Sequence, residues 1–194
     1  PRTWGGKREG AGRRPKGVRA GVPHARRLSH AARHPAHVTL RATRRDLPSL
    51  REHRVAAALG AVLKRHRAAA AGETGGAFAP SATGAARARR VLIASRFRVI
   101  HFSIEPDHIH LIVEAADATS LGRGMQGLAA QLAKRVNATL GRHGQVFADR
   151  YHDRILRSPR EVRHALAYVL NNWRKHGIAD RRDGPDPCSS GRWF

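Results

Sequence analysis

Two histidines with one residue between them are the side chains in this sequence best suited to chemistry. His108 and His110 lie in residues 105–113, an apolar run typical of a buried strand. Successive side chains of a strand point to opposite faces, so both imidazoles share one face, with Cα atoms roughly 6.6 Å apart. Imidazoles at that spacing can bind one metal ion. Because the chain holds 13 histidines, chance alone supplies about one such pair, and a half-exposed strand without a metal is the alternative.

A tyrosine on a predicted helix is the second group. Residues 158–161 supply an N-cap serine, a proline at the first helical position and the glutamate of a capping box, and Gly177 ends the helix. Tyr168 lies outside the apolar stripe, on one face with Asn172 a turn later. A phenol is a nucleophile, but with an ordinary pKa of about 10 it needs a nearby cation at neutral pH. The alternative is a structural tyrosine lying flat at the core boundary. The predicted buried stripe consists of Val162, Ala165, Leu166, Val169 and Trp173.

The charge of the chain points to a polyanionic partner. Its 37 Lys and Arg residues against 14 Asp and Glu give a net charge of +23, which favours nucleic acid. No apolar run approaches the ~20 residues of a membrane-spanning helix, and no secretion signal is visible. The single cysteine, Cys188, excludes an internal disulfide framework and a multi-cysteine zinc site. We therefore expect a cytoplasmic, nucleoid-associated protein that does not bind membranes.

The predicted elements give an α+β domain. Residues 37–41 predict a strand, residues 50 to about 70 a helix, and residues 71–89 a flexible loop. Residues 91–105 and 108–114 predict an antiparallel hairpin that turns at Pro106-Asp107. Ser120 is predicted to cap a further helix that stops at Gly141. Together with the helix that carries Tyr168, these elements predict a ferredoxin-like fold, a small antiparallel sheet with helices packed on one face.

Three blocks of sequence carry a family resemblance. They are residues 106–113 (PDHIHLIV), 144–152 (GQVFADRYH) and 164–172 (HALAYVLNN), and the likeness extends over roughly residues 36–177. Their order and separation resemble the HUH superfamily of single-strand DNA nucleases, and within it the single-tyrosine, IS200-like transposases. The likeness is greatest to the REP-associated tyrosine transposases.

The resemblance implies an enzyme that cleaves and rejoins single-stranded, hairpin-forming DNA through a 5′-phosphotyrosine. It implies Tyr168 as nucleophile and His108, His110 and Asn172 as ligands of Mg²⁺ or Mn²⁺, in a monomer or homodimer. Family members often have Asn-Pro where this chain has Asn172-Trp173, which puts the helix end in question. Tyr151, in the second block, is the rival nucleophile, and we interpret it as structural.

The sequence also predicts a division into three regions. Residues 1–35 form a basic arm that we expect to be disordered, residues 36–177 the catalytic domain, and residues 178–194 a C-terminal tail. The predicted nucleic-acid-binding residues are Arg123, Gln126, Lys134, Arg150 and Lys175.

Three other functions stay open on the sequence. The first is a domesticated, catalytically silent protein that binds DNA hairpins. The second is an RNA-binding protein with incidental histidines. The third is a zinc hydrolase, which needs a further ligand such as Glu114 or His101.

Overall fold

The computed structural model describes residues 30–43, 47–68, 96–175 and 184–193. Most of the predicted arm, the predicted loop 71–89 and Gly177 lie outside these residues. The strands are β1 (Ala36–Arg41), β2 (Phe97–Ile104), β3 (His108–Ala115) and β4 (His152–Ile155). The helices are α1 (His53–Ala68), α3 (Ala118–Thr139), α4 (Pro159–Lys175) and the short 3-10 helix η1 (Gly191–Trp193).

The four strands form one antiparallel sheet in the order β2-β3-β1-β4. With α1 between β1 and β2 and α3 between β3 and β4, this is the ferredoxin-like βαββαβ arrangement that the sequence predicts. The strand that the sequence does not predict is β4, whose four residues are alternately exposed and half-buried. Strand β1 is central and pairs with both β3 and β4.

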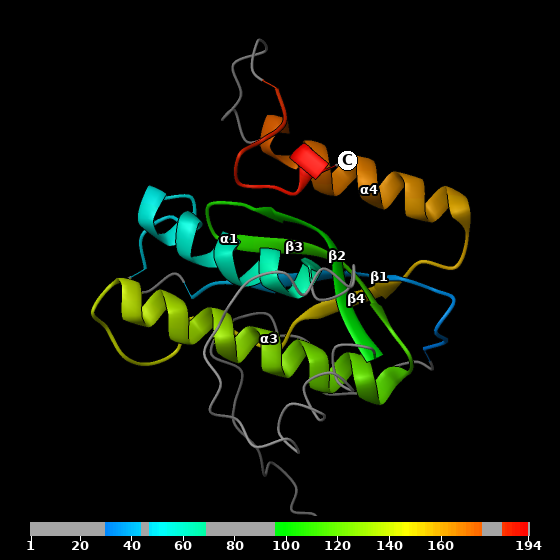
Figure 1. Cartoon of the computed structure of the whole chain (residues 1–194), viewed down its shortest axis with the longest axis horizontal. Coiled ribbons are helices and arrows are strands. Elements are labelled where there is room, and N and C mark those ends of the chain that lie inside the picture. The colour runs from blue at the N-terminus through cyan, green and yellow to red at the C-terminus, as the bar shows by residue number, and fades with distance from the viewer. Residues whose placement is uncertain (1–29, 44–46, 69–95, 176–183, 194) are drawn as a thin grey trace, which may run out of the picture.

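Helices cover both faces of the sheet. On one face, α1 and α3 pack over the main apolar core, which includes Val38, Leu111 and Leu128. On the other face α4 packs over a smaller cluster formed by Ile112, Leu156, Ala165 and Val169. Figure 1 shows α3 and α4 on opposite sides of the strands. The α+β class and the antiparallel sheet are confirmed, whereas the expectation that all helices share one face is wrong for α4. Ile112 explains the difference, because this apolar residue shares the face of the histidines and needs a cover of its own.

The N-termini of α3 and α4 test the predicted helix caps. The N-cap of α3 is Asp117, whose carboxylate accepts the Ser120 backbone N–H at 2.7 Å, so the prediction that Ser120 is the cap is wrong by one turn. This hydrogen bond lowers the pKa of Asp117. The capping box of α4 is confirmed, because Ser158 N donates to Glu161 Oε2 at 3.1 Å and Glu161 N donates to Ser158 Oγ at 3.2 Å.

Residues 184–193 pack against β2 rather than extending away from the domain. Arg51 donates two hydrogen bonds to the carboxylate of Asp186, at 2.7 and 2.8 Å, and Asp186 is fully buried. Ser190 Oγ accepts the backbone N–H of Phe102 at 3.0 Å, and Ser189 forms an isolated β-bridge with Ser103. The predicted tail therefore contributes to the core beside β2. None of the helices among the described residues is long and apolar enough to cross a bilayer.

Candidate active site

The sheet face under α4 carries His108 and His110 side by side. Their Nε2 atoms lie 2.9 Å apart and their ring centroids 4.5 Å apart, nearly perpendicular to each other. His110 is 4% exposed and the side chain of His108 is 17% exposed. The prediction that both imidazoles share one face is confirmed, because in the β1–β3 register Thr39 and Arg41 stand opposite them on the same side.

The other nitrogen of each imidazole faces a hydrogen-bonding group. Asp107 Oδ1 lies 2.7 Å from His108 Nδ1. His110 Nδ1 lies 3.1 Å from His37 Nε2 and 3.2 Å from Thr39 Oγ1. Metal-binding histidines in proteins usually have their second nitrogen held in this way, which fixes the tautomer and the ring.

Two imidazoles with their Nε2 atoms facing each other fit the edge of a metal site. Adjacent ligands of an octahedral ion with bonds of about 2.1 Å lie roughly 3.0 Å apart, close to the 2.9 Å between the two Nε2 atoms. In the part of the chain that the structure describes, no three His, Cys, Asp or Glu side chains gather around a common metal position. A metal bound here would therefore take its remaining ligands from other groups, such as an amide oxygen, and from water and substrate.

Tyr168 lies over these histidines from α4. Its ring centroid is 5.1 Å from that of His110 and 5.8 Å from that of His37, and both contacts are edge-on. Tyr168 is 39% exposed, and among the described residues it is the one large hydrophobic side chain that is exposed. Its ring is therefore open to solvent on one side and faces the histidines on the other. The structure thus brings Tyr168 together with His110.

Asn172 follows Tyr168 by one turn of α4, but it is only 2% exposed. The sequence places both residues on an exposed face, and for Asn172 this is wrong. Its neighbours Val169 and Trp173 are also buried, so Asn172 lies on the side of α4 that packs against the domain. The Asn172 amide therefore lies on the side of α4 that faces the sheet, and the two histidines lie on the side of the sheet that faces α4.

His37 is the residue of this cluster that the sequence analysis missed, together with the supporting Thr39 and Asp107. Burial lowers the pKa of His37, and nearby Arg154 lowers it further, which favours a neutral imidazole at pH 7. The alternation of His37 and Thr39 in a predicted strand was visible in the sequence. What the sequence lacked was the register that sets Thr39 opposite His110.

The residues considered as rivals lie elsewhere. Tyr151 is 9% exposed and packs in the core on the α1 and α3 side of the sheet. Glu114 forms an ion pair with Arg98, and His101 Nδ1 lies 3.1 Å from Ser190 Oγ. Neither Glu114 nor His101 completes a metal site with the histidine pair.

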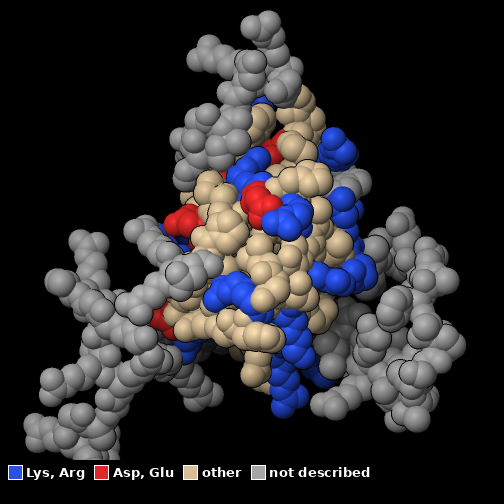
Figure 2. All heavy atoms as spheres, turned by 90° about the vertical axis from the view of Figure 1, so that its left-hand side faces the viewer, with Lys and Arg blue, Asp and Glu red and all other residues tan. Residues whose placement is uncertain are grey.

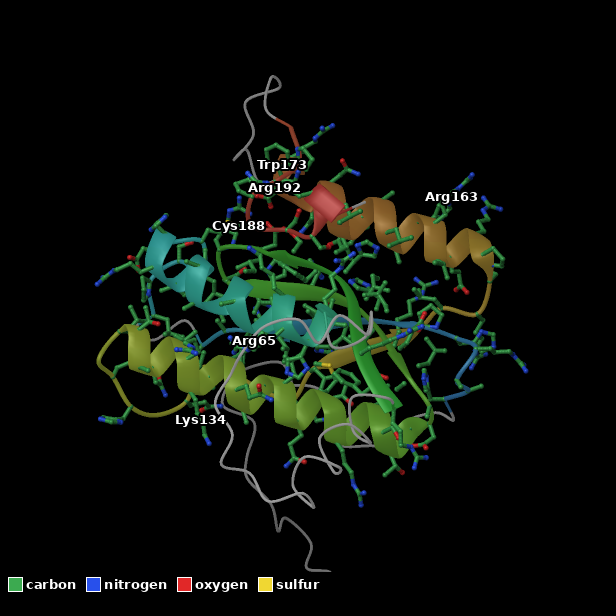
Figure 3. All side chains as sticks on the ribbon, in the orientation of Figure 1. Arg65, Lys134, Arg163, Trp173, Cys188 and Arg192 are labelled. Atoms are coloured by element: carbon green, nitrogen blue, oxygen red, sulfur yellow. The ribbon has the colours of Figure 1, made fainter. Side chains whose placement is uncertain are left out.

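The predicted nucleic-acid-binding residues do not gather at the histidines. Arg123, Gln126 and Lys134 are exposed on α3, which covers the opposite face of the sheet. Figure 3 shows Lys134 on the side of α3 that points away from the strands. Arg150 is half-buried in the loop before β4, and Lys175 is the last residue of α4. On the face that Figure 2 shows, Lys and Arg cover more of the described surface than Asp and Glu do.

A family model and a solved structure are similar to this chain. Residues 86–172 match the family model described as "Transposase IS200 like", a segment that contains both histidines, Tyr168 and Asn172. The structure described as a REP-associated tyrosine transposase bound to a REP hairpin superposes with a TM-score of 0.50, at 16% identity, over 81% of this chain and 76% of that one. This likeness supports the fold. No curated protein shows significant similarity to the chain. Over residues 86–172 the chain is similar to the IS200-like transposases.

Proposed function

We propose that this protein cleaves and rejoins single-stranded DNA through a covalent 5′-phosphotyrosine on Tyr168. The observation that carries the proposal is the 5.1 Å approach of the Tyr168 ring to His110, across the gap between a helix and a strand. A tyrosine placed only to fill the core boundary has no need of two facing histidines with fixed outer partners. The family and the net charge of +23 agree with a DNA substrate.

The reaction follows from the groups at the site. The Tyr168 hydroxyl loses its proton to solvent, which reaches the exposed ring, and its oxygen attacks the scissile phosphorus. The new bond joins the tyrosine oxygen to phosphorus, while the bond from phosphorus to the 3′-oxygen breaks. That oxygen takes a proton from solvent and leaves as a 3′-hydroxyl. Attack by a second 3′-hydroxyl reverses the step and rejoins DNA without an external energy source.

The residues that would hold a divalent ion, Mg²⁺ or Mn²⁺, are His108, His110 and Asn172. When bound, such an ion supplies positive charge next to the phosphate and favours the phenolate form of Tyr168. The Nδ1 atom of each imidazole is held by a neighbouring group. Asp107 holds that of His108, and Thr39 and His37 hold that of His110. Tyr168 lies over His110 of the same chain, with 5.1 Å between their ring centroids, so we infer that Tyr168 acts within its own subunit.

We expect the substrate to combine a hairpin with a single-stranded flank. The solved structure that resembles this fold is described as a REP-associated tyrosine transposase bound to a REP hairpin, and we extend that substrate class to this chain. The residues proposed to contact the strand are exposed Arg123, Gln126 and Lys134 on α3, half-buried Arg150 in the loop before β4, and Lys175, the last residue of α4.

The test is covalent capture with strands labelled at one end. Single strands from both flanks of the gene, and randomised strands, are incubated with the protein and Mn²⁺. A label at the 3′ end should move to the protein band, and a label at the 5′ end should appear on a shorter free strand. Tyr168→Phe and His108→Ala should abolish the adduct, and Tyr151→Phe should retain it.

Two results would contradict the proposal. An adduct that persists in Tyr168→Phe would assign the chemistry to another residue. Hairpin binding without any adduct, in Mn²⁺ and in Mg²⁺, would instead support the catalytically silent binding protein.

A further inference from the structure

A basic hollow lies beside the sheet, away from the histidine pair. Its volume is about 290 Å³, and it forms where the residues before β1 meet the end of β4 and the segment that leads into α4. These segments lie on the right of Figure 1. The residues that line it are His30, Ala31, Arg33, His34, Ile155 and Arg157. Four of these six are basic or imidazole side chains, and none is acidic.

The positive charge of the hollow is not balanced by the carboxylates near it. Among the described residues, no Asp or Glu forms an ion pair with Arg33 or Arg157. Arg33 Nε donates to His34 Nε2 at 3.1 Å, which uses one of its five N–H groups. Glu161, four residues after Arg157, already accepts from Arg154 and from the backbone N–H of Arg157.

A buried imidazole forms part of the wall. His30 is 8% exposed, and its Nε2 donates to the carbonyl oxygen of Ala115 at 3.0 Å. Its Nδ1 is buried without a hydrogen-bonding partner. Buried polar atoms are rarely left in this state, and an absent ion or water is a usual explanation.

Two arginines and an imidazole around a small hollow suit a phosphate group. We propose that this hollow binds a backbone phosphate of the DNA strand whose scissile phosphate lies at Tyr168. The choice of DNA rests on the proposed function, whereas the affinity for phosphate does not. Arg157 lies two residues before α4, and Pro159, the first residue of the helix, precedes Tyr168 by nine residues, or roughly 14 Å at 1.5 Å per residue. At the duplex spacing of about 3.4 Å per nucleotide, the strand would cover the distance from the start of α4 to Tyr168 in about four nucleotides.

The first arm of the test measures DNA binding with Arg33→Ala/Arg157→Ala. Each phosphate contact to a single strand contributes about 0.7 to the slope of log affinity against log salt, so losing two should make the slope shallower by about 1.4. At 0.1 M salt the affinity should fall by up to about 25-fold. The control is Arg160→Ala/Arg163→Ala, which removes the same charge from exposed positions of α4 that do not line the hollow, as Figure 3 shows for Arg163. An equal slope in the two double variants would overturn the proposal.

The second arm uses inorganic phosphate on the metal-free protein. Phosphate should shift the side-chain NMR signals of His30 and His34 saturably, chloride at equal ionic strength should not, and the shift should disappear in Arg33→Ala/Arg157→Ala. A shift that survives this variant would overturn the proposal, and so would phosphate binding with an unchanged DNA slope. The phosphate titration does not depend on DNA cleavage. If Tyr168 forms no adduct, the proposed function fails, but the titration still tests the hollow.

Discussion

His37 Nε2 lies 3.1 Å from Nδ1 of His110, so two imidazoles from neighbouring strands share one hydrogen. If Nε2 of His110 binds a metal, its Nδ1 carries the hydrogen and His37 accepts it. A carboxylate in the place of His37 would accept the same hydrogen but would add negative charge close to the attacking phenolate. A neutral imidazole fixes the ring without that repulsion, and the lowered pKa of His37 agrees with this role.

Replacing His37 should therefore weaken metal binding without unfolding the domain. We expect His37→Ala to lower the affinity for Mn²⁺ by about tenfold, the lower end of the usual cost of losing an outer partner of a metal ligand. His37→Gln, whose amide oxygen can accept the hydrogen bond, should recover part of the affinity. The measurement is a Mn²⁺ titration followed by electron paramagnetic resonance, with exposed His143→Ala as control. Equal affinities for His37→Ala and the wild type would contradict the assignment.

Two adjacent asparagines on α4 offer a matched test of the third ligand. Asn172 is 2% exposed, whereas Asn171 is exposed and donates to the carbonyl oxygen of Ala167 at 2.9 Å. Asn172→Leu, which conserves volume, should lower Mn²⁺ affinity at least about tenfold and prevent adduct formation, while Asn171→Leu should change neither. Thermal unfolding of both variants serves as the control for folding. If Asn172→Leu binds Mn²⁺ normally, the amide is structural and the metal takes its third ligand elsewhere.

The sequence predicts the parts of this site better than their arrangement. The spacing of His108 and His110 fixes their common face, because strand geometry leaves no other choice. The capping box at Ser158 likewise fixes the start of α4. These are local rules, and each depends on a few neighbouring residues.

Long-range packing accounts for what the sequence does not predict. His37 joins the site only because β1 pairs with β3 in the register that sets Thr39 against His110. Four-residue β4 is too short for a periodic signal and exists because it pairs with β1. Asp186 lies in a segment rich in glycine, proline and serine, and its buried carboxylate pairs with Arg51, which lies 135 residues earlier in the sequence.

Gly124 of α3 tests how closely this helix approaches the sheet. A Cβ at Gly124 would overlap the ring of Phe97 in β2, whereas a Cβ at Gly127 in the same helix meets nothing within 4 Å. We expect Gly124→Ala to lower the free energy of unfolding by about 1–3 kcal/mol through overpacking. Gly127→Ala should raise it by up to about 1 kcal/mol, because alanine favours the helix. Urea unfolding of both variants gives the comparison, and a stabilised Gly124→Ala would show that α3 and β2 can separate without cost.

The pair of Arg51 and Asp186 should stabilise the whole C-terminal segment. The Asp186 side chain is fully buried and that of Arg51 is 12% exposed, so removal of one partner leaves the other charge poorly solvated. Asp186→Ala should cost about 3–5 kcal/mol of unfolding free energy, and Arg51→Met with Asp186→Leu should recover part of that loss. Glu52→Ala, which breaks the exposed pair with Arg54, should cost less than about 1 kcal/mol. Urea unfolding measures all three variants. A loss below about 1 kcal/mol for Asp186→Ala would mean that residues 184–193 open easily and that β2 keeps its place without them.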